Sequence, residues 1–324
     1  TIKVKYQTIL LLTLVVMLLN NGCKKDLLHL QKVQKLNSNT TCRLNHIRFF
    51  GNNICIAAGG IQFDQSEILR STDGGYTWSN YSDPNARKSM YGMSVAYNGD
   101  IYLSGIDGDV LHSADSGKSW KSDQILTWQP YVGGCFITAD TGIFISSTLQ
   151  RQCTITRINS NYSIIDQQTY LFGLNNIYMI SSTTGYIIGY GAVMKTTDRG
   201  TNWNFQNVNG DNFTSMDIHS NEIWMCGANG GVYHTTDGGE HWDNLRDGNN
   251  ITLPRYMLRD IVFKDPVNGW AVGDNGLVIH TDDGGHHWME YDRFTTNTLR
   301  SIAICPNGDL ITAGDNGDIY RINP

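Results

Sequence analysis

The sequence contains few of the residues that usually build catalytic and metal sites. Its 324 residues include only six prolines and seven cysteines, and no two cysteines have the Cys-x-x-Cys spacing typical of zinc and redox sites. Glutamate is scarcer still, since the chain has only Glu67, Glu222, Glu240 and Glu290. Glycosidases generally need two carboxylates about 5–10 Å apart, and no pair of these four is expected to converge. The sequence therefore gives weak support to a zinc, redox or Glu-pair hydrolase site.

Basic residues are also in deficit. The chain carries 24 Lys and Arg against 30 Asp and Glu, for a net charge of −6. Two of the lysines, Lys3 and Lys5, belong to a segment that we expect to be cleaved, and their loss takes −6 to −8. Nucleic-acid binding rests on neutralising phosphates with Lys and Arg, so this balance argues against a nucleic-acid partner.

No hydrophobic run is long enough to cross a membrane as a helix, which needs about 20 residues. The longest is the 11-residue run Ile9–Leu19, which two lysines precede and Cys23 follows. This pattern predicts an export signal over residues 1–22. The run Leu19–Asp26 resembles the lipobox of Bacteroidetes-type lipoproteins, although Asn stands in the two places where Ala or Ser is usual. We expect lipidation at Cys23 and a lipidated tether over residues 23–43, which places the protein in the bacterial cell envelope, periplasmic or on the outer-membrane surface. An ordinary signal with an incidental cysteine is the alternative.

The chain does contain a repeat of about forty residues. Five copies of Ser/Thr-x-Asp-x-Gly-x-x-Trp begin 42, 83, 39 and 46 residues apart, and 83 is two periods with one copy missing. Such fixed-period self-similarity indicates the architecture more strongly than local propensity does. The copies are Ser71–Trp78, Ser113–Trp120, Thr196–Trp203, Thr235–Trp242 and Thr281–Trp288.

This eight-residue pattern resembles the Asp-box of sialidases and other β-propellers. The Asp and Ser/Thr side chains of such a turn accept hydrogen bonds from backbone N–H groups. Gly at the fifth position permits a positive φ, and Trp buries a large ring at the start of the next strand. We therefore interpret the boxes as structural turns with no catalytic role. Their residues are Asp73, Asp115, Asp198, Asp237, Asp283, Trp78, Trp120, Trp203, Trp242 and Trp288.

A second pattern, apolar-x-x-apolar-x-apolar, precedes each box and is followed by a Gly-punctuated strand. Asn-Gly and Asp-Gly pairs, such as Asp107-Gly108 and Asn275-Gly276, then mark hairpins. The pattern recurs every 39 to 46 residues and gives seven units, of which the third has Asn159–Ile164 in place of its box. Units of four short strands are propeller blades. The seven starts are Leu44, Met90, Tyr131, Leu174, Phe213, Leu258 and Leu299.

These units predict an all-β fold, a single seven-bladed β-propeller with four-stranded antiparallel blades over residues 44–324. The last unit supplies only three strands before the chain reaches Pro324. An unpaired sheet edge would expose N–H and C=O groups, so a fourth strand must come from elsewhere. We expect Leu28–Leu36 to be that outermost strand and to close the ring, although its apolar spacing also suits a short helix.

Other polar and sulfur residues are given structural interpretations. Cys55, Cys226 and Cys305 fall inside strands and are expected to be small core residues. Cys42–Cys55 and Cys135–Cys153 each lie within one unit, so pairing of these cysteines is an open alternative. The residue before each box is often cationic, and we expect it to be solvated and to bind no metal, because equivalent positions lie far apart in a ring. These residues are Arg70, His112, Lys195, His234 and His280.

Several units resemble the photosystem II stability/assembly factor-like propeller family more closely than they resemble sialidases. The clearest is Leu258–Trp288, and Leu299–Tyr320 and Leu174–Trp203 repeat its opening. Sialidases carry an Arg-Ile-Pro motif near their first blade, and this chain has none. The resemblance covers about residues 44–323 and implies a rigid, non-catalytic binding platform that needs no cofactor. It does not imply a photosynthetic partner.

We expect a membrane-anchored monomer that acts as a binding or assembly scaffold for a protein partner. A glycan-binding module, with Tyr91, Trp128 and Tyr256 as stacking rings, and a divergent sialidase-like glycoside hydrolase are the alternatives. The ligand surface should be the ring formed by the beginnings of the innermost strands. We expect that packing requires none of the residue types found at the second position of each inner strand, directly after its first apolar residue. Our candidate ligand-binding residues are Asn45, His46, Tyr91, Asn175, Thr214, Arg259, Asp260 and Arg300.

Overall fold

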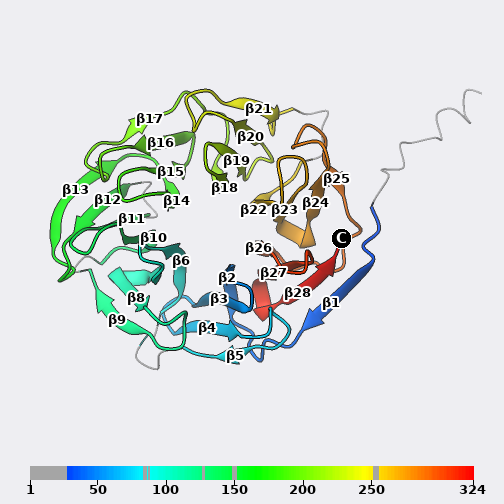
Figure 1. Cartoon of the computed structure of the whole chain (residues 1–324), viewed down its shortest axis with the longest axis horizontal. Helices are drawn as coiled ribbons and strands as arrows, with labels where there is room; N and C mark the ends of the chain where they lie inside the picture. The colour runs from blue at the N-terminus through cyan, green and yellow to red at the C-terminus, as the bar shows by residue number, and fades with distance from the viewer. Residues whose placement is uncertain (1–27, 83–85, 87, 126–127, 148–151, 251–254) are drawn as a thin grey trace, which may run out of the picture.

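The predicted seven-bladed β-propeller is confirmed. The computed structural model describes residues 28–82, 86, 88–125, 128–147, 152–250 and 255–324, and these form seven four-stranded antiparallel sheets arranged around a central axis (Figure 1). The predicted signal at residues 1–22 and the lipidation site Cys23 lie outside the described residues. Within the described part of the chain, no helix is long and apolar enough to cross a membrane.

Each blade runs from an inner strand at the axis to an outer strand at the rim. The inner strands begin where the sequence predicted, except that β2 begins one residue before Leu44. The inner strands are β2 (Arg43–Phe50), β6 (Met90–Val95), β10 (Tyr131–Phe136), β14 (Leu174–Met179), β18 (Phe213–His219), β22 (Leu258–Phe263) and β26 (Leu299–Ile304). The second strands are β3 (Ile54–Ile61), β7 (Ile101–Gly105), β11 (Gly142–Ser146), β15 (Gly185–Gly189), β19 (Glu222–Gly227), β23 (Gly269–Gly273) and β27 (Leu310–Gly314).

The outer half of each blade consists of its third and fourth strands. The third strands are β4 (Gln65–Ser71), β8 (Asp109–Ser113), β12 (Cys153–Ile158), β16 (Ala192–Thr196), β20 (Val232–Thr235), β24 (Val278–Thr281) and β28 (Ile319–Asn323). The outer strands are β5 (Ser79–Asn80), β9 (Lys121–Gln124), β13 (Ile164–Tyr170), β17 (Asn204–Phe205), β21 (Asp243–Arg246), β25 (Met289–Glu290) and β1 (Lys32–Leu36). Three short 3-10 turns complete the described elements: η1 (Ile106–Gly108), η2 (Asp274–Gly276) and η3 (Asp315–Gly317).

The ring is closed by the N-terminal strand. β1 pairs antiparallel with β28, from Lys32 opposite Asn323 to Leu36 opposite Ile319, and is the outermost strand of the seventh blade. This strand covers part of the segment Leu28–Leu36 for which the sequence predicted that role. Figure 1 shows β1 beside β28, so the two ends of the propeller lie in one sheet.

A second set of contacts, made by Arg321, joins the seventh blade to the first. Arg321 on β28 is buried and donates to Asp309 Oδ2 at 2.7 Å and to the carbonyl oxygen of Gly74 at 2.9 Å. Its guanidinium carbon lies 3.9 Å from the centre of the Tyr76 ring. Because Gly74 and Tyr76 belong to the Asp-box of the first blade, this side chain joins the last blade to the first.

The hydrophobic cores lie between neighbouring blades. One cluster unites Ile47 and Leu69 of the first blade with Ile311 and Ile319 of the seventh. Cys55, Cys226 and Cys305 are buried, as the sequence predicted. All six cysteines of the described residues are free, so the alternative pairings Cys42–Cys55 and Cys135–Cys153 are absent from this structure.

The Asp-boxes have the predicted hydrogen bonds. In the second blade, Asp115 accepts from the N–H groups of Lys118 and Ser119 at 3.0 and 2.9 Å and from the Ser119 hydroxyl at 2.7 Å. The Ser113 hydroxyl donates to Asp115 at 2.9 Å and accepts from the N–H of Gly117 at 2.8 Å. The turn therefore satisfies its own backbone, which supports a structural role for it.

The glycine of the box meets two requirements at once. Gly117 has a φ of +78°, which disfavours other residues. A Cβ atom at this position would lie 2.5 Å from Cδ1 of Ile56 in the preceding blade. A side chain there would therefore strain the turn and crowd the Ile56 side chain of the preceding blade.

Low pH should remove the stabilisation that the boxes provide. The Ser119 N–H and hydroxyl donors hold the pKa of Asp115 at about 2, below its usual 3.8. A carboxyl whose pKa is lower in the folded state adds stability above about pH 4, and that stability is lost as the pH falls toward 2. Asp115→Asn should therefore lower the urea midpoint at pH 6, with the difference shrinking between pH 4 and 2.

The matched control is Asp140→Asn, which removes the same charge at an exposed turn residue. Urea unfolding followed by circular dichroism at pH 6, 4, 3 and 2 makes the comparison. A constant difference between wild type and Asp115→Asn across this range would contradict the proposed contribution of the box.

The prediction of a solvated cationic position before each box is wrong. Arg70 is buried and donates to the carbonyl oxygen of Ser116 at 2.8 Å, in the next blade. Lys195 does the same to Gly238 at 2.8 Å. His112, His234 and His280 stack on Tyr102, Trp224 and Trp270 of their own blades, with ring centres 4.6, 4.7 and 4.9 Å apart. This position binds the next blade at Arg70 and Lys195, and it packs on an aromatic ring of its own blade at the three histidines.

Candidate functional site

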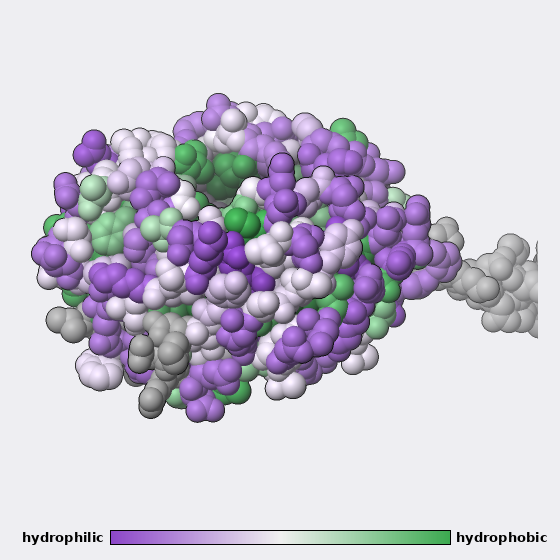
Figure 2. All heavy atoms as spheres, turned by 60° about the horizontal axis from the view of Figure 1, so that its bottom comes forward, coloured by the Kyte–Doolittle hydropathy of each residue, from purple (hydrophilic) through white to green (hydrophobic). Residues whose placement is uncertain are grey.

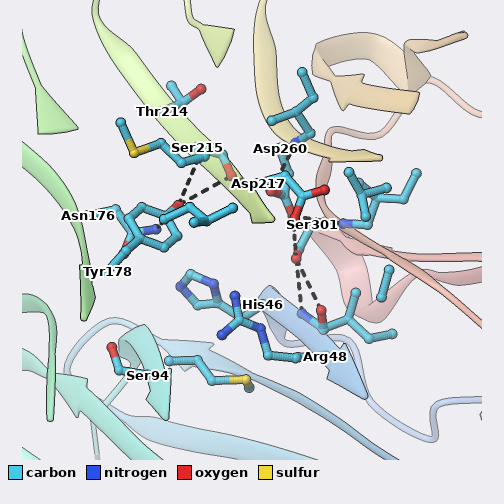
Figure 3. Close-up of a pocket in the computed structure, with 18 of the residues that line it drawn as sticks. His46, Arg48, Ser94, Asn176, Tyr178, Thr214, Ser215, Asp217, Asp260 and Ser301 are labelled. Carbon is cyan, nitrogen blue, oxygen red and sulfur yellow. Dashed lines mark hydrogen bonds between the residues drawn. The ribbon is translucent and has the colours of Figure 1, made fainter. Parts of the chain in front are cut away.

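The seven inner strands surround a polar cavity on the propeller axis. Its volume is about 540 Å³, and its walls come from β2, β6, β10, β14, β18, β22 and β26. We number each inner strand from its first apolar residue, so Leu44, Met90, Tyr131, Leu174, Phe213, Leu258 and Leu299 are first residues. Third and fifth residues contribute most of the polar lining, and Figure 3 shows them converging from several blades.

A β-bulge explains why the third and fifth residues line this cavity. In all seven inner strands the pairing register shifts between the first and the third residue, as between Leu258 and Asp260. A bulge leaves one residue without a partner in the ladder and bends the strand. The unpaired residue is the second one, which is free to bond to a neighbouring strand.

Side-chain oxygens in the cavity wall bind the backbone of the next blade. We call these five residues the inner latches: Ser94, Tyr178, Asp217, Asp260 and Ser301. Each accepts a backbone N–H from the inner strand that follows in the ring. The donors are Gly134 at 3.2 Å, Met216 at 3.0 Å, Phe263 at 2.6 Å, Ile302 at 2.9 Å and Ile47 at 3.1 Å, respectively.

Asp260 is the most heavily bonded of the inner latches. One carboxylate oxygen accepts from the hydroxyl of Ser215 at 2.6 Å and from the N–H of Ile261 at 3.0 Å. The other accepts from the hydroxyl of Ser301 at 2.7 Å and from the N–H of Ile302 at 2.9 Å. Asp260 thus joins the fifth, sixth and seventh blades, and its four donors all come from the wall (Figure 3).

Three of the predicted ligand-binding residues also hold blades together. Asn45, Asn175 and Thr214 each donate to the carbonyl oxygen of the first inner-strand residue in the next blade. The distances to Met90, Phe213 and Leu258 are 2.7, 2.6 and 3.2 Å. The expectation that packing requires none of these residue types is therefore wrong, because each one satisfies a carbonyl of its neighbour.

The two predicted arginines are held by carboxylates of their own blades. Arg259 binds both oxygens of Asp274 at 2.7 and 3.0 Å, and Arg300 binds Asp315 at 2.6 Å. The two acids belong to η2 and η3. Both arginines line the cavity, as do His46, Thr214 and Asp260. Asn45, Tyr91 and Asn175 are outside its lining, so the structure brings together five of the eight predicted residues.

His46 is half-buried in the wall, and its ring Nε2 lies 2.7 Å from the carbonyl oxygen of Tyr91. Burial lowers the pKa of His46, so its ring is neutral at neutral pH. Burial also raises the pKa of the Tyr178 hydroxyl, which stays protonated. These two groups therefore add hydrogen-bonding capacity to the cavity without adding charge.

Sequence reasoning missed Arg48, the fifth residue of β2. Its side chain is exposed in the cavity beside His46 (Figure 3), and it makes no hydrogen bond or ion pair within the described residues. The strand alternation at His46 and Arg48 was the available signal, because every second residue of a strand faces the same side. Six of the eight candidate residues from the sequence were instead second residues of the inner strands, and none was a fifth residue.

The aromatic residues proposed for glycan binding do not form a common surface. Tyr256 is buried at 4% exposure, Tyr91 is half-buried and Trp128 is 82% exposed. Figure 2 shows a mainly hydrophilic face on which hydrophobic residues form separate patches. Within the described residues no group of three His, Cys, Asp or Glu side chains is placed to hold a metal ion.

Comparison with known proteins relates part of this chain to one family of propellers. Residues 158–254 match the family model described as photosynthesis system II assembly factor YCF48. Over 103 residues the chain is 29% identical to the photosystem II assembly lipoprotein Ycf48 of Synechococcus sp. (strain CC9902). That match covers 29% of this chain and 31% of the relative, so it spans about a third of the relative's length. Over these residues the chain resembles the photosystem II assembly factor family.

Solved structures extend the likeness to the whole ring. YCF48 bound to a D1 peptide has a TM-score of 0.67 and 16% identity, and the comparison covers 92% of this chain and 99% of that one. A virginiamycin B lyase from Staphylococcus aureus reaches a TM-score of 0.69 at 12% identity, covering 90% and 99%. At these identities the likeness shows the fold alone, and that fold also occurs in an enzyme.

Proposed function

We propose that this assembly factor-like propeller is a non-catalytic scaffold that binds a protein partner at the cell envelope. The single observation that carries the proposal is the YCF48 match, because one solved YCF48 structure holds a D1 peptide. The partner of this chain is an extended protein segment, which the polar cavity and its mouth receive. The monomeric state and the absence of a cofactor belong to the same proposal.

The cavity supports binding better than hydrolysis. Asp260 and Asp217, two acids of its wall, accept hydrogen bonds from backbone N–H groups of neighbouring blades. A glycosidase needs one carboxyl group free to donate a proton and another free to act on the sugar. Glycan binding is the second alternative, and the buried ring of Tyr256 weighs against it.

The binding test must leave no carboxylate unpaired. A fourfold variant neutralises both arginine–carboxylate pairs beside the cavity. It combines Arg259→Gln with Asp274→Asn and Arg300→Gln with Asp315→Asn. We expect this variant to capture at least ~10-fold less partner from native membranes than wild type, because a charge-assisted hydrogen bond contributes about 1.5–3 kcal/mol. Quantitative mass spectrometry after cross-linking measures the capture.

Asp115→Asn is the control, because it alters an Asp-box at the rim and leaves the cavity intact. Its capture should match wild type. Equal capture by this variant would exclude the Arg259–Asp274 and Arg300–Asp315 pairs from the binding surface.

Anchoring at Cys23 is the second part of the proposal. The sequence pattern around Cys23 supports it, and the Synechococcus relative is named a lipoprotein. In a Bacteroidetes host, Cys23→Ala should abolish incorporation of labelled palmitate and release the propeller from membranes. Cys42→Ala is the control, because Cys42 is buried within the propeller. Unchanged membrane fractionation of Cys23→Ala would refute the lipid anchor.

A further inference from the structure

Among the described residues, Arg48 is the one charged side chain in the cavity wall that has no hydrogen-bonding or ion-pair partner. Asp260 accepts from four donors of the wall, and Asp217 accepts from the N–H of Phe263 and from His219. Arg259 and Arg300 are paired with Asp274 and Asp315. Arg48 makes no hydrogen bond or ion pair in the described part of the chain, and its guanidinium faces the cavity (Figure 3).

The groups around Arg48 are suited to an anion. His46 is neutral at neutral pH because burial lowers its pKa, and the Tyr178 hydroxyl is protonated because burial raises its pKa. The Arg48 guanidinium therefore meets neutral polar groups on these sides. Asp217 and Asp260 line the same cavity, so a doubly charged anion would be repelled more strongly than a singly charged one.

We propose that Arg48 binds a single carboxylate carried by a peptide segment that enters the cavity, either a free carboxyl end or an acidic side chain. The planar guanidinium offers two parallel N–H donors, which match the two oxygens of a carboxylate. A cavity of about 540 Å³ admits a few residues and excludes a folded domain. This inference rests on the proposed function and names the chemical group that the cavity recognises.

Three pools of dansyl-labelled random hexapeptides test the inference on the full chain. The first has free carboxyl ends and lacks Asp and Glu, the second has amidated ends and contains Asp and Glu, and the third is amidated and lacks both acids. Fluorescence anisotropy should detect binding of the first or second pool and not of the third. Arg48→Gln should weaken that binding roughly 10- to 100-fold, as expected for loss of a charge-assisted pair.

Two further variants make the result specific. Arg255→Gln removes the same charge at an exposed residue outside the cavity lining and should bind like wild type. Arg48→Lys keeps the charge but lacks the two parallel N–H donors of the guanidinium, so it should bind the peptides with intermediate affinity. The melting temperature of Arg48→Gln should stay within about 2 °C of wild type, because Arg48 holds no other residue.

Several outcomes would overturn the inference. These are equal binding of all three pools, binding of none, or unchanged affinity in Arg48→Gln. Arg48-dependent binding of sodium acetate with an affinity equal to the peptides would assign the site to a free small carboxylate and overturn the peptide source. If Arg48→Gln still captures the membrane partner as wild type does, this inference fails while the proposed function stands.

Discussion

Deletion of residues 28–36 will lower the melting temperature by about 10 °C or more. The deletion removes β1, so β28 becomes an exposed edge, and Leu36 is lost from the core where it is 6% exposed. Burying a Leu side chain contributes about 1.5–3 kcal/mol, and the deletion also removes Val33 from the separate cluster between the sixth and seventh blades. Asp318, which is fully buried, also loses its ion pair with Lys35. Differential scanning calorimetry measures the change.

Adding the deleted strand back as a peptide distinguishes the loss of β1 from a general folding defect of the truncated protein. A synthetic peptide of residues 28–36, added to the truncated protein, should recover most of the melting temperature by pairing with β28. Lys32→Ala, which changes an exposed side chain of the same strand, should behave like wild type. A truncated protein as stable as wild type would show that β1 does not close the ring.

Asp260→Ala will destabilise the protein by about 3–4 kcal/mol, since hydrogen bonds to a charged group contribute about 1.5–3 kcal/mol each and water in the cavity replaces some of them. The change removes four accepted hydrogen bonds that link three blades. Urea unfolding at pH 7 gives the free energy. Asp260→Asn keeps one acceptor oxygen and should lose less.

Arg48→Gln is the control in the same cavity, because Arg48 faces the same space without holding a neighbouring blade. Its free energy of unfolding should lie within about 0.5 kcal/mol of wild type. A loss below about 1 kcal/mol in Asp260→Ala would show that the inner latch at this position adds little to stability.

The fold could be predicted from the sequence because its signals are local. Each box contains the hydrogen bonds that form its own turn. Asp115 and Ser113 make theirs within the eight residues of the box, and Gly117 has the positive φ that the pattern implied. The closing segment could be found for a different reason, since a ring with one strand missing must recruit another. Its limits, Lys32–Leu36, depend on the pairing with β28 and not on the segment's own composition.

The cavity could be predicted only in part because contacts between blades depend on tertiary register. Asn45 bonds to Met90, 45 residues away, and nothing in the pattern around Asn45 shows which carbonyl it meets. The bulge in every inner strand also turns the second residue away from the ladder and brings the third and fifth to the axis. Arg48 was missed for that reason, and the role of Arg70 was misjudged because its acceptor, Ser116, belongs to another blade.

Hydrogen–deuterium exchange of the full chain, with and without the captured partner, tests the central claim most directly. If the cavity is the binding surface, the partner will protect peptides from β2, β14 and β22, and the Asp-box turns at the rim will exchange as before. Protection confined to the outer strands β5, β9 and β13, with the inner strands unchanged, would contradict binding in the cavity.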